Sequence, residues 1–434
     1  MRIAWFSPAA GESGVVEYSR RVLEVLQRVA EPVLFCAGTP EGFPGGIRAV
    51  DFTVDRDELG QLGRYDAVVY NLGNNYRYHG PIWDVARSHP GILVLHDRVL
   101  HHFFVQCFQD RRLGAVSYLD RVNRLYGPAA HDVAGHMLDP QQWGMVTGEQ
   151  LLQYSFIEEA VRVARGVVVH SRWHGKAVRR AWSGPLCELW LPAHDQQSSP
   201  AQLRREDGRA ILLTLGHVEF NKHVDKVVQA FAHDLELSAR ARYLIAGAYH
   251  PDSPYVRELS EQVAGHSLAG TVNLIGYLSP AELVDHAAAT DVFVNLRQPN
   301  FEGSSASLMY ELAFGKPVVV YRSGSFAELP DDVVVKVTPG DELDLLLRLR
   351  ELVDQEGRRA QIGAAARRFA ERRSTQAYVG ELLAFATEVG TWTPRAEIAE
   401  HIGQELAALG ADRRLNGVER VAREAVTLFG LPRS

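Results

Sequence analysis

The apolar residues of the chain gather in short runs that alternate with amphipathic segments. Five runs without polar alternation in the first half predict strands buried on both faces, at residues 2–6, 32–36, 66–72, 91–96 and 166–170. The same rhythm restarts in the second half, at residues 210–216, 241–247, 271–276, 291–296 and 316–321. The first two runs are separated by 16–29, which has the apolar spacing of a helix. Strands that alternate with helices predict parallel sheets, so the pattern indicates two α/β domains.

The boundary between the two domains is predicted in a polar stretch. Residues 191–209 contain two prolines and show neither strand nor helix period. We therefore predict an N-terminal Rossmann-like domain at 1–195, a linker at 196–209 and a second Rossmann-like domain at 210–385. The remaining residues, 386–434, form a charged tail with a helical pattern.

Composition narrows the class of protein. The chain has 434 residues, of which 46% are hydrophobic and 23% charged, as is typical of soluble globular proteins. A formal net charge of −7 disfavours nucleic-acid binding, which needs an excess of lysine and arginine to neutralise phosphates. Three widely separated cysteines have no metal-ligand spacing and favour a reducing compartment. The apolar run at the N-terminus is too short for a signal peptide, and no segment has the roughly 20 apolar residues of a membrane span. We expect a cytoplasmic protein, for which peripheral membrane contact stays open.

The loops that follow the predicted strands are the candidate ligand-binding segments. Open parallel sheets bind ligands at the carboxyl ends of their strands, so two such domains predict a site in the cleft between them. The first loop, at 8–19, contains Gly11 and Gly14 and leads into a helix whose first N–H groups point toward it. An ordinary strand-to-helix turn explains this loop as well as phosphate or sugar binding does.

The second loop, at 215–226, places Lys222 just before a helix. A helix N-terminus carries about half a positive charge, so a lysine there is favourable mainly when both face an anion. Gly216 ends the strand and His217 adds a hydrogen-bond donor. A solvated lysine and a loop histidine remain the alternatives on these residues alone.

The third loop lies within 295–332 and combines a carboxylate with a helix start. Glu302, Gly303, Ser304 and Ser305 follow a buried strand and precede a helix that begins near Ala306. The serines are candidate N-cap residues. Glu302 could accept hydrogen bonds from sugar hydroxyls while free N–H groups bind a phosphate, or it could be a surface residue.

Three stretches in this order resemble the retaining nucleotide-sugar glycosyltransferases of the GT-B fold, in the bacterial group called glycosyltransferase family four. They are WFSPAAGESGVVEYS, LGHVEFNKHVDKVVQAF and EGSSASLMYELAFGKPVV. NLGNNYRYHG and GILVLHDRVLHHF are also similar to family segments, so the resemblance covers residues 1 to about 385. It implies two Rossmann-like, doubly wound parallel-sheet domains that face each other across a deep cleft, followed by a helical C-terminal tail.

The resemblance also implies roles for residues that match the family pattern. Lys222 matches the lysine that neutralises the donor diphosphate. Glu302 matches the glutamate that contacts the transferred sugar, and Gly14 the loop glycine near the diphosphate. His96 matches a histidine of the reaction cleft and is accompanied by Asp97; a satisfied pair at the end of a strand is the alternative for these two.

Two positions depart from the family pattern. The arginine expected after the loop glycine is His217, which leaves the local charge dependent on pH. The second glutamate of the motif is expected at 310, where the chain has Tyr310, with Glu311 next to it. Neighbouring helix positions point about 100° apart, so a contact with the donor ribose by Tyr310 or by Glu311 stays open.

Base and acceptor recognition are expected from two further segments. Tyr277 and Leu278 follow a strand at the position implied for the nucleotide base, and the sequence does not distinguish UDP-, GDP- and TDP-sugars. The acceptor side is expected near Asn71, His79 and Asp97. Their neighbourhood would suit a sugar, a lipid-linked sugar or a natural product, and it would equally suit the edge of a core.

The activity implied by the resemblance is transfer of a sugar from a nucleoside diphosphate to an acceptor hydroxyl with retained anomeric configuration. Lysine and helix N-termini would stabilise the leaving diphosphate, so no metal and no cofactor beyond the nucleotide sugar are expected. An epimerase or a phosphorylase on the same fold is one alternative. A degenerate, non-catalytic glycosyltransferase-like scaffold subunit is the other, suggested by His217 and Tyr310.

Overall fold

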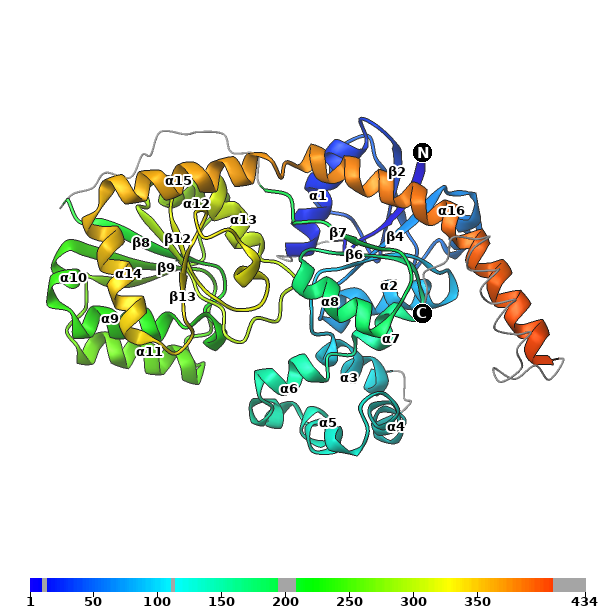
Figure 1. Ribbon diagram of the computed structural model, residues 1–434, viewed down its shortest axis with the longest axis horizontal. Coiled ribbons are helices and arrows are strands. Elements are labelled where there is room, and N and C mark those ends of the chain that lie inside the picture. Colours follow the sequence, from blue (N-terminus) through cyan, green and yellow to red (C-terminus); the bar gives the residue numbers. More distant parts are fainter. Residues whose placement is uncertain (10–13, 111–113, 194–207, 409–434) are drawn as a thin grey trace, which may run out of the picture. The chain divides into compact units, whose positions relative to one another are not determined.

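The computed structural model describes residues 1–9, 14–110, 114–193 and 208–408, with side chains described as far as residue 391. The chain divides into two compact units, which we call unit 1 and unit 2 (Figure 1). Unit 1 comprises Met1–Leu189 together with the chain from Val379, and unit 2 comprises Trp190–Tyr378. Residues 194–207, which include most of the predicted linker, lie outside the described residues.

Unit 1 is built on a seven-stranded parallel sheet with the order β3-β2-β1-β4-β5-β6-β7. In register, Trp5 of β1 lies between Leu34 of β2 and Val69 of β4. The strands are β1 (Arg2–Phe6), β2 (Glu31–Cys36), β3 (Arg48–Asp51), β4 (Ala67–Leu72), β5 (Gly91–Leu95), β6 (Ala164–Val169) and β7 (Leu186–Glu188).

The helices of unit 1 connect these strands, and five of them follow one another between β5 and β6. Figure 1 shows α3 to α6 gathered in one helical lobe. The helices are α1 (Gly14–Leu26), α2 (Tyr76–Ser88), α3 (His101–Asp110), α4 (Gly114–Tyr126), α5 (His131–Met137), α6 (Gly148–Gln153), α7 (Ile157–Val161) and α8 (Arg172–Ala181). Short 3-10 helices are η1 (Arg56–Arg64), η2 (Pro128–Ala130) and η3 (Pro140–Met145).

The last described helix, α16 (Thr375–Ala408), packs on the sheet of unit 1. A Cβ placed on Gly166 of β6 would lie 2.5 Å from Val389 and 3.1 Å from Phe385, so the backbone of β6 approaches this helix closely. Glycine at 166 is therefore a packing requirement. The contact boundary between the units, at residue 378, falls near the start of this helix rather than at the predicted 385.

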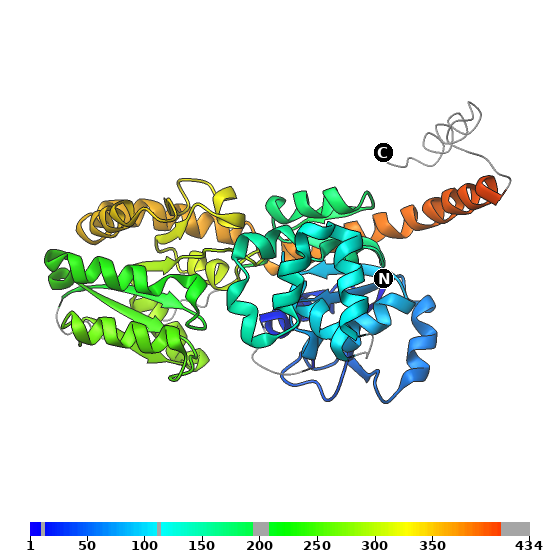
Figure 2. The same cartoon turned by 90° about the horizontal axis from the view of Figure 1, so that it is seen from below.

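Unit 2 is built on a six-stranded parallel sheet with the order β10-β9-β8-β11-β12-β13. Its strands are β8 (Ala210–Leu215), β9 (Ala241–Ala246), β10 (Val272–Gly276), β11 (Val292–Asn295), β12 (Val318–Tyr321) and β13 (Val335–Val337). Helices cover both faces of the sheet (Figure 2). They are α9 (Val224–His233), α10 (Leu235–Arg240), α11 (Pro254–Gly265), α12 (Pro280–Ala289), α13 (Ala306–Ala313), α14 (Glu342–Asp354) and α15 (Glu356–Glu371), with 3-10 helices η4 (Phe220–Lys222) and η5 (Gly324–Glu328).

Each sheet has its own hydrophobic core. In unit 1, Phe6 of β1 packs between Phe35 and Tyr70 of the neighbouring strands, with ring centroids 4.8 and 4.7 Å apart. In unit 2, Val227 of α9 and Leu349 of α14 are both fully buried and pack in one cluster with the strands. The apolar runs of the sequence are thus central strands, as expected for parallel sheets covered on both faces.

The predicted α/β class with two doubly wound parallel sheets is confirmed. All ten predicted strands are present within two residues of their expected bounds. The short strands β3, β7 and β13 and the helical lobe between β5 and β6 were not predicted. Among the described residues, no helix is both long enough and apolar enough to cross a membrane. The three cysteines form no disulfide.

Candidate functional site

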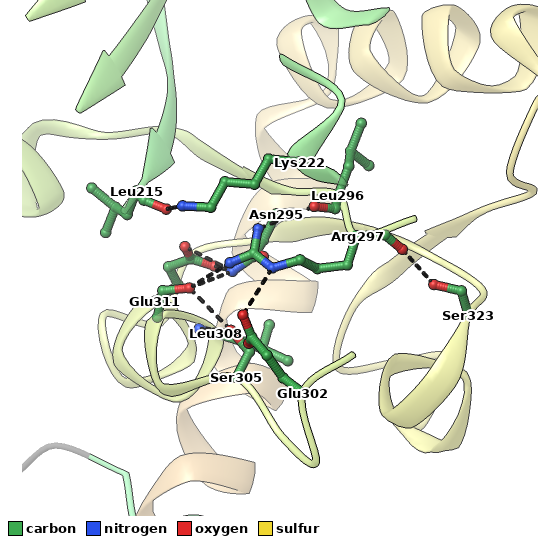
Figure 3. Close-up of polar contacts among 11 residues, drawn as sticks. Leu215, Lys222, Asn295, Leu296, Arg297, Glu302, Ser305, Leu308, Glu311 and Ser323 are labelled. Atoms are coloured by element: carbon green, nitrogen blue, oxygen red, sulfur yellow. Dashed lines mark hydrogen bonds and ion pairs between the residues drawn. The ribbon is translucent and has the colours of Figure 1, made fainter. Parts of the chain in front are cut away.

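Lys222 lies in η4, between β8 and the first turn of α9, and its side chain turns inward. The residue is only 8% exposed, and its ammonium donates a hydrogen bond to the Leu215 carbonyl at 3.1 Å (Figure 3). Burial and, after it, the nearby positive charge of Arg297 lower the pKa of Lys222 to about 7. A solvated surface lysine, the alternative at the sequence level, does not describe this side chain.

Gly216 provides the space that the Lys222 ammonium occupies. Its φ is +92°, in the region that favours glycine, and a Cβ at this position would lie 2.6 Å from the Lys222 nitrogen. The glycine is thus required both by its backbone conformation and by the close approach of the lysine.

Glu302 lies in the loop before α13, with its side chain 37% exposed. Its carboxylate is 3.7 Å from the Arg297 Nε (Figure 3). Ser305 is the N-cap of α13, because its hydroxyl accepts a hydrogen bond from the Leu308 N–H at 3.4 Å. Gly303 and Ser304 are buried beside it.

Glu311 of α13 is completely buried. Both of its carboxylate oxygens accept hydrogen bonds from the Asn295 side-chain amide, at 3.0 and 2.9 Å (Figure 3). Burial raises the pKa of Glu311 to about 8, and the Asn295 hydrogen bond and the charges of Arg297 and Lys222 oppose this rise. The Tyr310 ring packs on Phe314, with centroids 5.0 Å apart. The carboxyl group next to the expected motif position is therefore held inside unit 2.

The other candidate donor residues lie at the carboxyl ends of two strands. His217 is exposed directly after Gly216. Tyr277 follows β10 and is 62% exposed, and Leu278 beside it is half-buried. These positions agree with strand-end loops, the place where open parallel sheets bind ligands.

Asn71, His79 and His96 meet at the carboxyl ends of β4 and β5 in unit 1. The Asn71 amide donates to the Phe6 carbonyl at 2.8 Å, which leaves its oxygen to accept from the His96 Nε2–H at 3.1 Å. The His79 Nδ1–H donates to the Asn71 carbonyl at 3.1 Å. Asp97 instead accepts from the Asn74 N–H at 2.7 Å. His96 and Asp97, which follow β5, thus each have a hydrogen-bond partner within unit 1.

Two further histidines, His170 and His174, complete what we call the histidine cluster, together with His79 and His96. The His170 ring centroid is 5.1 Å from that of His96, and Tyr18 of α1 packs edge-on to His96 at 4.8 Å. Burial lowers the pKa of His79 and of His170 to about 4. It lowers the pKa values of His96 and His174 well below the usual range. The cluster is therefore neutral at physiological pH.

Gly14 is the first residue of α1, and residues 10–13 before it lie outside the described residues. A Cβ at Gly14 would meet no atom of the described residues within 4 Å. Packing of the described residues thus does not explain a glycine at this position.

A metal site has no support among the described residues, where no group of three or more histidine, cysteine or carboxylate side chains could hold an ion. Asn295 and Arg297, for which the sequence pattern predicted no role, lie between Lys222 and Glu311 (Figure 3). Their signal in the sequence was the polar segment NLRQPN directly after a buried strand.

Comparison with protein families and curated sequences identifies relatives of part of the chain. Residues 195–369 match the family model described as glycosyl transferases group 1. The alpha-monoglucosyldiacylglycerol synthase of Streptococcus pneumoniae is 27% identical over 132 residues, 30% of this chain and 29% of the synthase. A GDP-mannose-dependent monoacylated alpha-(1-6)-phosphatidylinositol monomannoside mannosyltransferase of Corynebacterium glutamicum is 25% identical over 209 residues, 46% of this chain and 53% of the relative. The match thus spans about a third to a half of the curated relatives.

Comparison with solved structures extends the likeness of the fold over most of the chain. HepE of Anabaena, solved in complex with UDP and glucose, has a TM-score of 0.61 at 14% identity and covers 89% of this chain and 99% of its own. The lipopolysaccharide-biosynthesis glycosyltransferase WaaG has a TM-score of 0.59 at 13% identity and covers 88% of this chain and 98% of its own. At this level of identity, the likeness concerns the fold.

Proposed function

We propose that this protein is a retaining glycosyltransferase, because residues 195–369 match the family model of the group 1 glycosyl transferases and the chain has the GT-B fold. It would move a sugar from a nucleoside diphosphate to an acceptor hydroxyl. The observation that carries the proposal is the buried ammonium of Lys222, which has a carbonyl as its hydrogen-bond acceptor and interacts electrostatically with Arg297 and with Glu302, in the loop before α13. A buried cation without a bound counter-ion is unfavourable, and a diphosphate would remove that cost.

The proposed chemistry needs no nucleophilic side chain. The bond between the anomeric carbon and the diphosphate oxygen breaks, and its electron pair leaves with the diphosphate. The acceptor oxygen attacks the anomeric carbon from the same face, and its proton passes to the departing phosphate oxygen, so the configuration is retained. Lys222 and the N–H groups at the start of α13 would stabilise the charge that accumulates on the leaving group.

Glu302 would hold the transferred sugar by accepting hydrogen bonds from its hydroxyls. Its half-exposed carboxylate forms an ion pair with the Arg297 guanidinium at 3.7 Å and offers two acceptor oxygens, which supports this role. The histidine cluster of unit 1 is our candidate for the acceptor side. Neutral imidazoles at the carboxyl ends of β4, β5 and β6 suit an uncharged hydroxyl group.

The acceptor class is proposed from the names of the curated relatives. The names of both curated relatives describe glycolipid synthesis. Lipid-linked hydroxyls therefore belong in the first panel of acceptors, together with free sugars. The relatives match only 29% and 53% of their own length, so donor and acceptor both need a direct test.

The first test is a thermal-shift screen of the full chain against UDP, GDP, TDP and ADP and their common sugar conjugates, with and without EDTA. A ligand that binds the folded state raises the melting temperature as its concentration exceeds its dissociation constant. We expect a shift with one nucleotide series that survives EDTA. No shift with any nucleotide would contradict the proposal and favour a non-catalytic scaffold.

Two variants then test the assigned roles. Lys222→Ala is expected to weaken diphosphate binding by about 1.5–3 kcal/mol, the usual contribution of a charged hydrogen bond. Lys226→Ala is the matched control, because Lys226 lies four residues later and pairs with Glu342 at 2.8 Å. Glu302→Ala is expected to impair sugar transfer while the free nucleoside diphosphate still binds. Equal losses for both ligands would instead indicate that Glu302 supports the fold.

A further inference from the structure

Arg297 follows β11, and its side chain is almost completely buried within electrostatic reach of Lys222. The residue is 3% exposed, and its charge is the second cause of the lowered pKa of Lys222, after burial. Figure 3 shows its guanidinium between Glu302 and Glu311, at the start of α13. Two cations thus lie close together inside unit 2.

Most hydrogen-bond donors of these two cations are unused. Arg297 has five N–H donors and Lys222 has three. Among the described residues, Arg297 donates to the Leu296 carbonyl at 3.1 Å and, over a long 3.5 Å, to the Ser307 hydroxyl. Its Nε is buried without a hydrogen bond, and Lys222 donates once, to Leu215. Buried donors without acceptors are unfavourable, which favours a ligand with several acceptor oxygens.

The carboxylates nearby balance this charge only in part. Glu302 forms an ion pair with Arg297, but its oxygen is 3.7 Å from the Nε, beyond hydrogen-bond distance, and its side chain is half-exposed. Glu311 has a pKa raised to about 8 by burial, so at neutral pH most of it is uncharged. The ligand-free site therefore keeps a positive charge that an anion would neutralise.

His217 occupies the position at which the resembling family has its second cation, and it is exposed in the loop after β8. We propose that Arg297 is a second diphosphate-binding cation of this protein, which with Lys222 holds the phosphate groups in place of the arginine missing at 217. This inference rests on the proposed function, because it assigns a residue to the donor site of that reaction. A planar guanidinium binds phosphate oxygens through paired N–H groups, which an ammonium cannot do.

A purely structural Arg297 would behave differently. If its task were only to position Glu302, loss of the arginine would weaken binding of the nucleotide sugar but not of the free diphosphate, which lacks the sugar. If its task were only to support the fold, loss would affect diphosphate, monophosphate and nucleoside alike. Free nucleotides of different phosphate number therefore separate the three roles.

The test is isothermal titration calorimetry of the full chain with UDP, UMP and uridine and with GDP, GMP and guanosine. Arg297→Gln is expected to lower affinity for the diphosphate by about tenfold to a hundredfold, with a smaller loss for the monophosphate and little for the nucleoside. Arg322→Gln is the matched control, since Arg322 lies in the same unit, is half-exposed and faces Asp331 at 3.8 Å. The double variant His217→Arg with Arg297→Gln is expected to recover part of the lost affinity.

Each outcome bears on one claim. If the wild-type chain binds no diphosphate, the proposed function fails. If the wild type binds and Arg297→Gln binds equally well, the function stands and the role of Arg297 is overturned. If Arg297→Gln does not fold, Arg297→Lys keeps the charge but loses the paired donors. It is expected to bind the diphosphate several-fold less tightly with unchanged nucleoside binding, and unchanged diphosphate binding would again overturn the inference.

Discussion

Replacing Gly216 by alanine tests the geometry of the candidate site with a single methyl group. The added Cβ would lie 2.6 Å from the Lys222 nitrogen, whereas ordinary contacts begin at 3.4 Å. The ammonium is the mobile end of a long side chain, so it would retreat by about 0.8 Å rather than force the backbone apart. This retreat moves it from the position in which it donates to the Leu215 carbonyl.

Two effects of different size are expected from this change. Alanine at a φ of +92° should lower the free energy of unfolding by about 1–2 kcal/mol, because its Cβ crowds the backbone. Displacement of Lys222 removes a charged hydrogen bond, which contributes about 1.5–3 kcal/mol. If the ammonium binds a diphosphate, its displacement also lowers affinity for that ligand, by roughly tenfold to a hundredfold.

Denaturant unfolding and calorimetry with UDP or GDP measure the two effects separately. Gly270→Ala is the matched control, because Gly270 has a φ of +80° in the same unit and a Cβ there would meet nothing within 4 Å. It should show the backbone strain without the loss of affinity. In a Lys222→Ala background, Gly216→Ala should cause little further loss of affinity, since the ammonium that it displaces is already gone.

Either of two results would contradict the role assigned to the Lys222 ammonium. Gly216→Ala could bind the diphosphate as tightly as the wild type while losing only as much stability as Gly270→Ala, which would mean that the ammonium position does not matter. Alternatively, the loss of affinity could be equally large with and without Lys222. In that case the methyl group would act on the ligand or on the backbone, and not through the lysine.

Three further predictions concern pH and packing. Affinity for the diphosphate should be retained at pH 7 and should fall above it by up to tenfold per pH unit. The reason is that Lys222, with a pKa of about 7, loses its proton, while Glu311, with a pKa of about 8, becomes negatively charged. An affinity that calorimetry finds constant from pH 7 to 9 would contradict this prediction. The free energy of unfolding should decrease as the pH falls from 6.5 to 4, because the histidine cluster is neutral in the folded state and its members protonate more readily in the unfolded state. The expected loss is about 3 kcal/mol for each histidine whose pKa is lowered to about 4. A melting temperature that stays constant over this pH range would show that the histidines are not buried as described. Gly166→Ala should destabilise unit 1 by about 1–3 kcal/mol, since the added methyl group would overlap Val389 and Phe385. The control is Gly135→Ala, which adds a methyl group in open space within a helix and should be neutral or stabilising in the same melting assay. Gly114→Ala is unsuitable as a control, because Gly114 has a positive φ.

The central strands could be predicted because each is a continuous apolar run between polar turns. The three strands that were missed lie at or next to the edges of their sheets and are only three or four residues long, as in Leu186–Glu188, where all residues are half-buried. A strand of this kind is defined by pairing with its neighbour and not by its own apolar pattern. The helices between β5 and β6 are short and separated by turns, so they gave little periodic signal.

The candidate site could be predicted only where a role depends on local sequence. Lys222 was found because a lysine before a helix is unusual, and Ser305 because N-cap residues have a typical position. Arg297 was missed because its importance comes from burial next to Lys222, 75 positions earlier in the chain, and burial of an arginine has no local signature. The burial of Glu311 depends likewise on Asn295, the last residue of β11, which lies 16 positions earlier in the chain.

The strand ends of the two units differ in charge, and this difference fits the proposed roles of unit 2 in donor binding and of unit 1 in acceptor binding. In unit 2, Lys222 and Arg297 bring buried positive charge and unused donors to the carboxyl ends of β8 and β11. In unit 1, the corresponding edge carries the histidine cluster, whose burial keeps it neutral and whose hydrogen bonds go mainly to carbonyl and amide oxygens. An anionic diphosphate gains most from the first environment, because a buried charge needs an opposite charge. An uncharged hydroxyl gains from the second, because neutral imidazole nitrogens can donate or accept without desolvating an ion. In the proposed reaction, the charged diphosphate would therefore bind at the strand ends of unit 2 and the neutral acceptor hydroxyl at those of unit 1.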